Sequence, residues 1–234
     1  MNVRMSARLL GSLALTLVAC GGAAAAPSPS ASATATATAT PTPTPAATAS
    51  TTAPGAWTIT SDSKATVSVR EQLVGLSLPS DAILVASGAT GSFTVSADGT
   101  FSADSKISFD LATLKSDQSQ RDSFVKQSVL QTRQFPTATF VPVKATGLAS
   151  PIASGADLKF QMSGTITIRG ITKDVTFDVV AKRSGGQLRA TATAAPTWKF
   201  GDFGMQPPAI PGRVLSVVDE IHLVVDLVAT GPAA

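Results

Sequence analysis

The chain has 234 residues, which is enough for one sizeable domain and accessory segments. It contains one Cys, one His and no Tyr, so neither an internal disulfide nor a Cys/His metal cluster can form. The 18 basic and 15 acidic side chains nearly balance, and the few aromatic residues do not alternate with Lys and Arg, which excludes a nucleic-acid-binding surface.

The first 20 residues, MNVRMSARLLGSLALTLVAC, have the form of an export signal. Arg4 and Arg8 precede the apolar run 9–18, which is too short to span a bilayer as a permanent helix. The ending LVAC resembles the lipobox of bacterial lipoproteins, in which the signal is cut before the Cys and the Cys is lipidated. We therefore expect a signal peptide over 1–19, lipidation of Cys20, and a protein that is exported and lipid-anchored at the bacterial cell membrane or envelope surface. The alternative is an ordinary secretory signal.

Residues 20–55 form an Ala/Thr/Pro-rich segment of low complexity. The segment has no apolar periodicity, so it cannot bury enough surface to offset the entropy lost on ordering. We expect a disordered linker, a stalk whose fully extended reach is on the order of 100 Å at about 3.1 Å per residue. Its Ser, Thr and Pro content is also typical of O-glycosylated stalks.

Residues 56–231 carry the patterns of a folded β domain. The clearest pattern is in 164–182, GTITIRGITKDVTFDVVAK, where apolar and polar side chains alternate on both sides of Gly170. Strict alternation is typical of strands with one buried and one solvent-facing side, and Gly170 supplies the turn of a hairpin. The same reasoning predicts about eight strands, over residues 57–72 (with a break at 61–64), 82–97 (bent at Gly88 and Gly91), 101–111, 137–146, 158–169, 172–182, 187–197 and 214–229.

Between the third and fourth of these strands the apolar period changes to that of a helix. Residues 118–131 are predicted to form a short helix with Phe124 on its apolar side. Asp117, followed three residues later by Gln120, resembles a capping box at its start.

Long antiparallel strands in sequence order favour a sheet that closes on itself, because closure removes the exposed edges. We therefore predict an all-β fold, a roughly eight-stranded antiparallel barrel with one short helix, preceded by the disordered stalk. The interior of an eight-stranded barrel is just wide enough for side chains or for one small ligand.

Four segments, in the same order, carry a resemblance to a known family. They are Arg121-Asp122, 134–140 (QFPTATF), 164–179 with the core IRGITK, and 202–205 (DFGM). With these segments the domain resembles the YceI-like lipid/polyisoprenoid-binding family. The resemblance implies a lipocalin-like barrel whose apolar lumen holds a long isoprenoid or related lipid, in an exported protein. It also allows a homodimer. We expect no cofactor and no metal.

Apolar side chains on the predicted strands and helix are the candidate lipid contacts. On the residues alone, they can equally fill a packed barrel core, whereas the resemblance favours a lumen lined for lipid. The candidates are Phe93, Phe101, Phe109, Phe124, Phe160, Ile166, Ile168, Phe177, Phe203 and Leu223.

Three cations are candidates for contact with a lipid head group. Arg121, next to Asp122, has a planar guanidinium that suits a phosphate, although a structural ion pair that holds the helix to the barrel is the alternative. Arg169 and Lys173 flank the hairpin turn, where they can contact a head group at the rim or stay solvated.

No catalytic residue is expected. His222 alternates with apolar neighbours and so should face out of the barrel, and the carboxylates of Glu71, Asp178 and Glu220 are also expected to point mostly outward. The sequence therefore predicts a non-enzymatic envelope lipoprotein that binds a polyisoprenoid, quinone-like or other long-chain lipid for carriage, storage or protection. Two alternatives stay open: a non-binding structural or adhesion barrel on a stalk, and an enzyme acting on a lipid or small acid.

Overall fold

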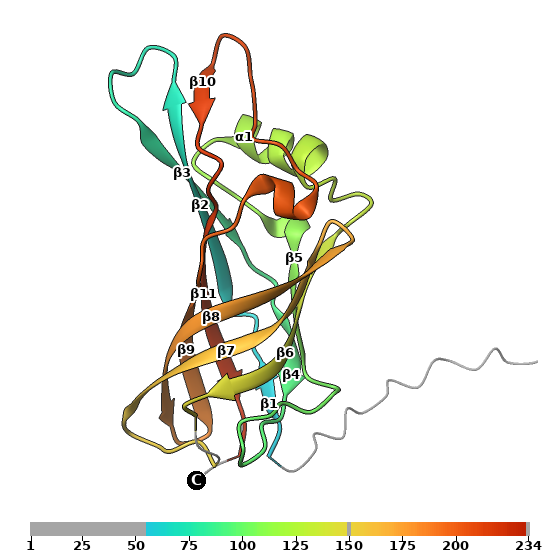
Figure 1. Ribbon diagram of the computed structural model, residues 1–234, viewed down its shortest axis with the longest axis vertical. Coiled ribbons are helices and arrows are strands. Elements are labelled where there is room, and N and C mark those ends of the chain that lie inside the picture. The colour runs from blue at the N-terminus through green and yellow to red at the C-terminus, as the bar shows by residue number, and fades with distance from the viewer. Residues whose placement is uncertain (1–54, 149–150, 233–234) are drawn as a thin grey trace, which may run out of the picture. The chain divides into compact units, whose positions relative to one another are not determined.

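The computed structural model describes residues 55–148 and 151–232 of the chain (Figure 1). The predicted signal peptide, the lipidation site Cys20 and all but the last residue of the predicted linker lie outside the described residues. Within the described part, every strand pairing is antiparallel.

Eight strands pair in a closed ring, which confirms the predicted barrel. The ring closes where the first strand meets the last, with Thr58 opposite Thr230 and Ile59 opposite Ala229. In ring order the strands are β1 (Trp57–Ile59), β4 (Thr90–Phe93), β5 (Lys106–Asp110), β6 (Thr137–Thr146), β7 (Asp157–Ile168), β8 (Ile171–Ser184), β9 (Gln187–Ala194) and β11 (His222–Thr230).

Three further strands extend the barrel wall beyond the ring: β2 (Lys64–Leu73), β3 (Ser80–Ala86) and β10 (Val214–Val217). The first half of β2 pairs with β11 and its second half with β10, while β3 runs along the other edge of β2. Figure 1 shows this extension projecting beside helix α1 (Ser119–Phe124). We call this the upper end of the barrel, and the end that holds β1 the lower end.

The hairpin of β7 and β8 forms as its alternation predicts. Ile168 pairs with Ile171, so the connection is the two-residue turn Arg169-Gly170, and both residues have positive φ angles of 53° and 74°. Such φ values are those of a type I′ turn, whose twist matches that of the flanking strands. The inward face buries Ile166, Val175 and other apolar side chains of both strands.

Several predicted strands differ from the observed ones in their limits, and the clearest differences are in three of them. The predicted strand 82–97 is two strands, because the chain turns between β3 and β4 at Gly88, whose φ is 70°. The strand predicted to begin at Phe101 begins at Lys106, since Ser102 and Ser105 close a hydrogen-bonded turn before it. The final run breaks into β10 and β11 where Ile221 exchanges backbone hydrogen bonds with Trp198.

The helix lies where the sequence predicts it, but its start is built differently. After α1 the chain continues as a π-helical turn, η2 (Val125–Val129). The predicted capping box is absent: Gln118 is the N-cap residue and makes no side-chain capping bond. Instead, the Asp122 carboxylate accepts hydrogen bonds from the backbone N–H and the hydroxyl of Ser116, at 2.7 and 2.6 Å. None of the helices in the described ranges is both long and apolar enough to cross a bilayer.

Candidate functional site

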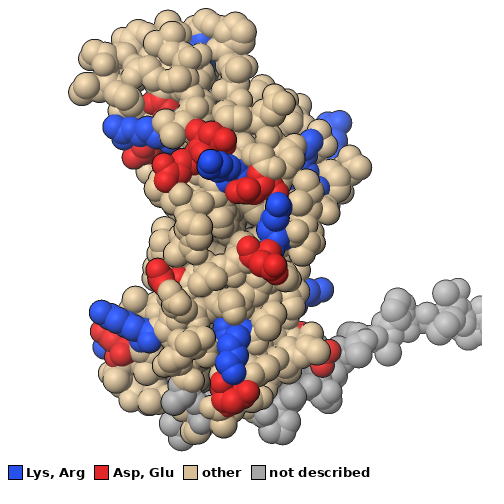
Figure 2. All heavy atoms as spheres, viewed as in Figure 1, with Lys and Arg blue, Asp and Glu red and all other residues tan. Residues whose placement is uncertain are grey.

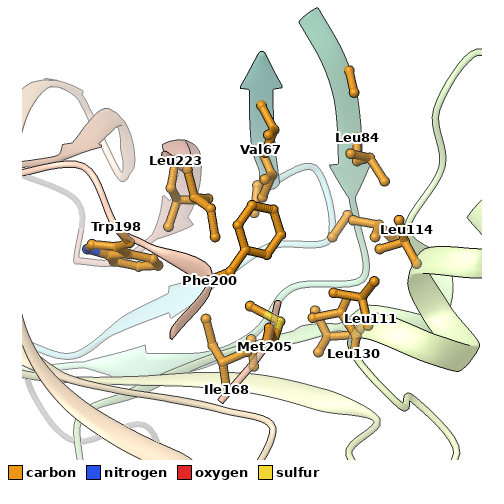
Figure 3. A pocket seen from close by; sticks show the side chains of 18 of the residues that line it. Val67, Leu84, Leu111, Leu114, Leu130, Ile168, Trp198, Phe200, Met205 and Leu223 are labelled. Carbon is orange, nitrogen blue, oxygen red and sulfur yellow. The ribbon is translucent and has the colours of Figure 1, made fainter. Parts of the chain in front are cut away.

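The upper half of the barrel encloses a cavity of about 440 Å³. Its walls are the inner faces of β2, β3, β5 to β9 and β11, and further lining comes from α1, η2, the 3₁₀ turn η3 (Phe200–Phe203), β10 and the loop before it. Figure 3 shows apolar side chains from these elements converging on it, among them Val67, Leu84, Leu111, Leu114, Leu130, Ile168, Trp198, Phe200, Met205 and Leu223.

The space exists because several inward positions of the wall carry alanine. Side chains alternate across a strand, so every second residue points into the barrel, and a methyl group at such a position does not reach the barrel axis. The lower end is different, because large rings fill it: Trp57 stacks on Phe93 with centroids 6.4 Å apart, and Phe93 meets Phe101 edge-on at 5.9 Å. The alanines that line the cavity are Ala65, Ala82, Ala86, Ala138 and Ala192.

Most of the predicted lipid contacts lie around this cavity. Phe93, Phe101 and Phe160 do not: they surround a separate void of about 40 Å³ at the lower end, where they pack the barrel core. The position of these three residues is therefore that of side chains that fill a packed barrel core, the alternative to lipid contact. The predicted residues that line the main cavity are Phe109, Phe124, Ile166, Ile168, Phe177, Phe203 and Leu223.

The segment around η3 supplies three large lining residues that the sequence did not single out. Trp198, Phe200 and Met205 all line the cavity, and the Trp198 ring meets Phe203 edge-on at 5.3 Å and Phe177 at 6.1 Å. This segment follows neither a strand period nor a helix period, so periodicity gives no sign of its inward face. The dense cluster of aromatic residues in WKFGDF was the available signal.

The polar lining residues lie on one side of the otherwise apolar cavity and centre on a buried ion pair. Arg121 Nη2 lies 2.5 Å from Glu71 Oε1, and the two side chains are 15% and 8% exposed. Arg121 also pairs with Asp117, and Arg213 donates to the side chain of Gln120. Because Arg121 lies on α1 and Glu71 on β2, this pair is the structural alternative considered for Arg121, an ion pair that holds the helix to the barrel. The polar lining residues are Glu71, Gln118, Gln120, Arg121 and Arg213.

The expectation that Glu71 points outward is wrong. The residue is 7% exposed and lines the cavity, because it continues the inward series of Ala65, Val67 and Val69 along β2. The period of two along that strand was the signal for this orientation. Asp178, Glu220 and His222 are exposed, as expected.

The other two predicted head-group contacts lie away from the cavity. Arg169 donates a hydrogen bond from Nη1 to the carbonyl of Gly204, which ties the β7–β8 turn to the end of η3. Lys173 is exposed and borders an outer groove together with Thr176 and Asp202. No group of three His, Cys, Asp or Glu residues within the described ranges is placed to hold a metal ion.

Comparison with known proteins assigns the barrel domain to a protein family. Residues 57–229 match the model of the YceI-like domain. The chain belongs to the YceI-like family. Among its curated relatives, a UPF0312 protein of Pseudomonas putida is 33% identical over 135 residues, which are 51% of this chain and 66% of that protein. A UPF0312 protein of Pseudomonas fluorescens is 33% identical over 126 residues, 47% of this chain and 61% of that protein. The chain thus spans just under two thirds of the length of these YceI-like relatives.

Two solved structures share the YceI-like fold seen here. One is a polyisoprenoid binding domain from Saccharophagus degradans, implicated in plant cell wall breakdown. It superimposes with a TM-score of 0.55 at 13% identity, over 75% of this chain and 98% of that one. The other, Burkholderia cenocepacia BcnA, gives a TM-score of 0.53 at 18% identity, over 72% and 97%. At these identities the likeness concerns the fold alone.

Proposed function

We propose that this YceI-like protein binds a polyisoprenoid, a quinone-like molecule or another long-chain lipid in the apolar cavity, and that it carries, stores or protects that lipid at the cell envelope. The observation that carries the proposal is the cavity itself. Its volume of about 440 Å³ falls within the range of roughly 300–1,000 Å³ that is typical of small-molecule sites. Its lining is apolar apart from the polar cluster around Glu71 and Arg121.

An apolar cavity of this kind can bind a lipid tail without any chemical step. Burying one methylene contributes roughly 0.8 kcal/mol, so about a dozen lipid carbons contribute on the order of 10 kcal/mol before the costs of association. The polar residues on one side of the cavity supply hydrogen-bonding groups for a head group. The combination suits an amphiphile with one polar end and a long apolar tail, which agrees with the polyisoprenoid binding named for the S. degradans domain.

The structure favours binding over the two alternatives. A barrel with a purely structural role needs no cavity of this size, and large rings fill the lower end of this same barrel. For an enzyme, the cavity would need an acid and a base that can exchange a proton. Glu71 is the one carboxylate among the described lining residues, and the group paired with it is the Arg121 guanidinium rather than a second carboxyl group or a His.

We further propose that the chain is exported and anchored through lipidated Cys20, with the linker holding the barrel away from the anchor. We also propose that the protein forms a homodimer. Replacing Cys20 by Ser should abolish incorporation of labelled palmitate into the protein in bacterial cells. Incorporation that persists in that variant would contradict the anchor.

The cavity proposal is tested with residues 55–234, purified without detergent. We expect native mass spectrometry to show a stoichiometric adduct, and organic extraction to release an isoprenoid or a quinone. A protein that arrives empty and also fails to take up added isoprenoid would overturn the proposal and favour the structural barrel.

A further inference from the structure

Exposed apolar side chains gather at the upper end of the barrel. The loop 74–79 joins β2 to β3, and residues 206–215 lead into β10; together they form what we call the apolar tip. A backbone hydrogen bond of 2.9 Å from Val74 to Arg213 joins the two segments. Leu78 is 75% exposed and Leu215 66% exposed. Val74 and Leu76 are each about half exposed as well.

Arg213, which donates a hydrogen bond to the Gln120 side chain, is the one charged residue of the tip, and the other charged side chains lie below it. The sequences of 74–79 (VGLSLP) and 206–212 (QPPAIPG) contain no Asp, Glu, Lys or Arg. The nearest ion pairs are those between Arg70 and Asp81, at 3.0 Å, and between Arg121 and Glu71. In Figure 2 the uppermost part of the molecule is almost entirely uncoloured, with a band of blue and red spheres beneath it. The surface therefore changes from apolar to charged along the barrel axis.

The apolar tip is continuous with the cavity. Leu73, Pro208 and Val214 line the cavity, and their neighbours Val74 and Leu215 face the solvent. The outer face of a solvated antiparallel sheet is normally polar, and contiguous exposed apolar patches mark interaction sites. Neighbouring residues of the tip thus present apolar side chains both to the cavity and to the solvent.

We propose that the apolar tip inserts into the interface of a lipid bilayer, so that a lipid passes between the membrane and the cavity without crossing water. A side chain such as Leu78 then lies at the boundary between head groups and acyl chains, and the ion pairs below the tip stay at the level of the head groups. Two narrow loops suit insertion between lipids better than they suit a protein–protein contact, which needs a face of about 800 Å² per partner. The passage of lipid rests on the proposed function, whereas the docking itself does not.

Site-specific fluorescence tests the docking directly. In the chain from residue 20 onward with Cys20→Ser, both the apolar signal segment and the acyl group are absent, and Leu78→Cys introduces a single thiol for an environment-sensitive NBD label. With vesicles of equal parts phosphatidylcholine and phosphatidylglycerol, we expect the emission to shift to shorter wavelength and to be quenched by lipids that carry a nitroxide near the head group. The control label at Ala156→Cys, in the exposed β6–β7 loop, should not respond. An unresponsive label at position 78 would overturn the proposal.

Vesicle flotation provides the second measurement. In the same background, Leu78→Ser with Leu215→Ser should lower the fraction of protein that floats with the vesicles by on the order of tenfold. The matched control replaces Val143 and Val180, which are about half exposed on the barrel wall, by Ser, and should float like the parent. A tip variant that floats unchanged, or that only converts a dimer to a monomer in light scattering, would contradict membrane docking.

Organic extraction separates this proposal from the proposed function. Tip variants that keep their bound lipid and lose flotation support docking and leave the cavity proposal intact. Chains that float normally but yield no lipid, the parent included, refute the cavity proposal alone.

Discussion

At the scale of single residues, the pair of Glu71 and Arg121 stands out because both side chains are largely removed from solvent. Removing Arg121 as Arg121→Met leaves a buried carboxylate without its cation, and we expect a loss of about 3–5 kcal/mol in the free energy of unfolding. Adding Glu71→Met should restore most of that loss, because two apolar groups of similar volume can replace a buried pair. Urea unfolding at neutral pH measures both effects.

The control for this pair is the exposed pair of Arg70 and Asp81, whose side chains are about half exposed. Arg70→Met should change the free energy of unfolding by less than about 1 kcal/mol, since exposed ion pairs are screened by water. An Arg121→Met variant no less stable than Arg70→Met would show that the buried pair has no special role.

A second residue-scale prediction concerns pH and the turn at Asp98. Hydrogen bonds from the hydroxyl and backbone N–H of Thr100 to the Asp98 carboxylate, with a smaller contribution from nearby Lys144, lower the pKa of this group from 3.8 to about 2. Because the folded-state pKa is depressed, the stabilisation is complete above the unfolded value of 3.8 and is lost as the pH falls through about 2. This contribution to the free energy of unfolding is small, because the Asp98 carboxylate is exposed to solvent.

The test compares the parent chain with Asp98→Asn, in which the amide oxygen can still accept from the Thr100 N–H. Between about pH 5 and about pH 2 the parent should lose more stability than the variant in urea unfolding. An equal loss of stability in the two chains would show that the Asp98 carboxylate does not contribute to the pH dependence of folding.

At the scale of elements, the contact between β6 and β7 depends on a residue without a side chain. A Cβ placed on Gly164 would clash with the Val141 carbonyl oxygen and would lie 2.8 Å from the Phe140 ring. We expect Gly164→Ala to lower the free energy of unfolding by about 1–3 kcal/mol, because the two strands must move apart. Gly201→Ala is the matched control, since nothing lies within 4 Å of its Cβ position. Equal thermal stability of the two variants would contradict this account.

At the scale of the whole molecule, the cavity is space left by alanine in an otherwise packed barrel. Ala138→Leu with Ala192→Leu should fill part of the cavity, reduce the lipid that copurifies, and change stability by no more than about 1–3 kcal/mol. Mass spectrometry of the purified chain, together with urea unfolding, measures both. Val143→Leu, on the exposed outer face of β6, is the control and should leave the bound lipid unchanged.

The strands of the barrel show how much of the fold the alternation of apolar and polar residues predicts. In β7 and β8 the alternation identified the strands, their turn and the inward position of Ile166 and Phe177, because a period of two places successive side chains on opposite faces. The same period, applied to β2, would have placed Glu71 inside. The charge of Glu71 made an inward position unexpected. Only the structure shows that the Arg121 side chain lies next to the carboxylate and offsets the cost of burying it.

The sequence by itself determined the all-β class, the closed antiparallel barrel, the single helical insertion and the family, since these follow from local periodicity, turn residues and short motifs. Only the tertiary structure decided which apolar residues surround a cavity and which pack the core. Phe93 and Phe109 belong to equally regular strands, yet the first packs the lower end and the second lines the cavity. Height along the barrel axis makes that difference, and it depends on which strands pair and in what register, which are contacts between residues far apart in the chain.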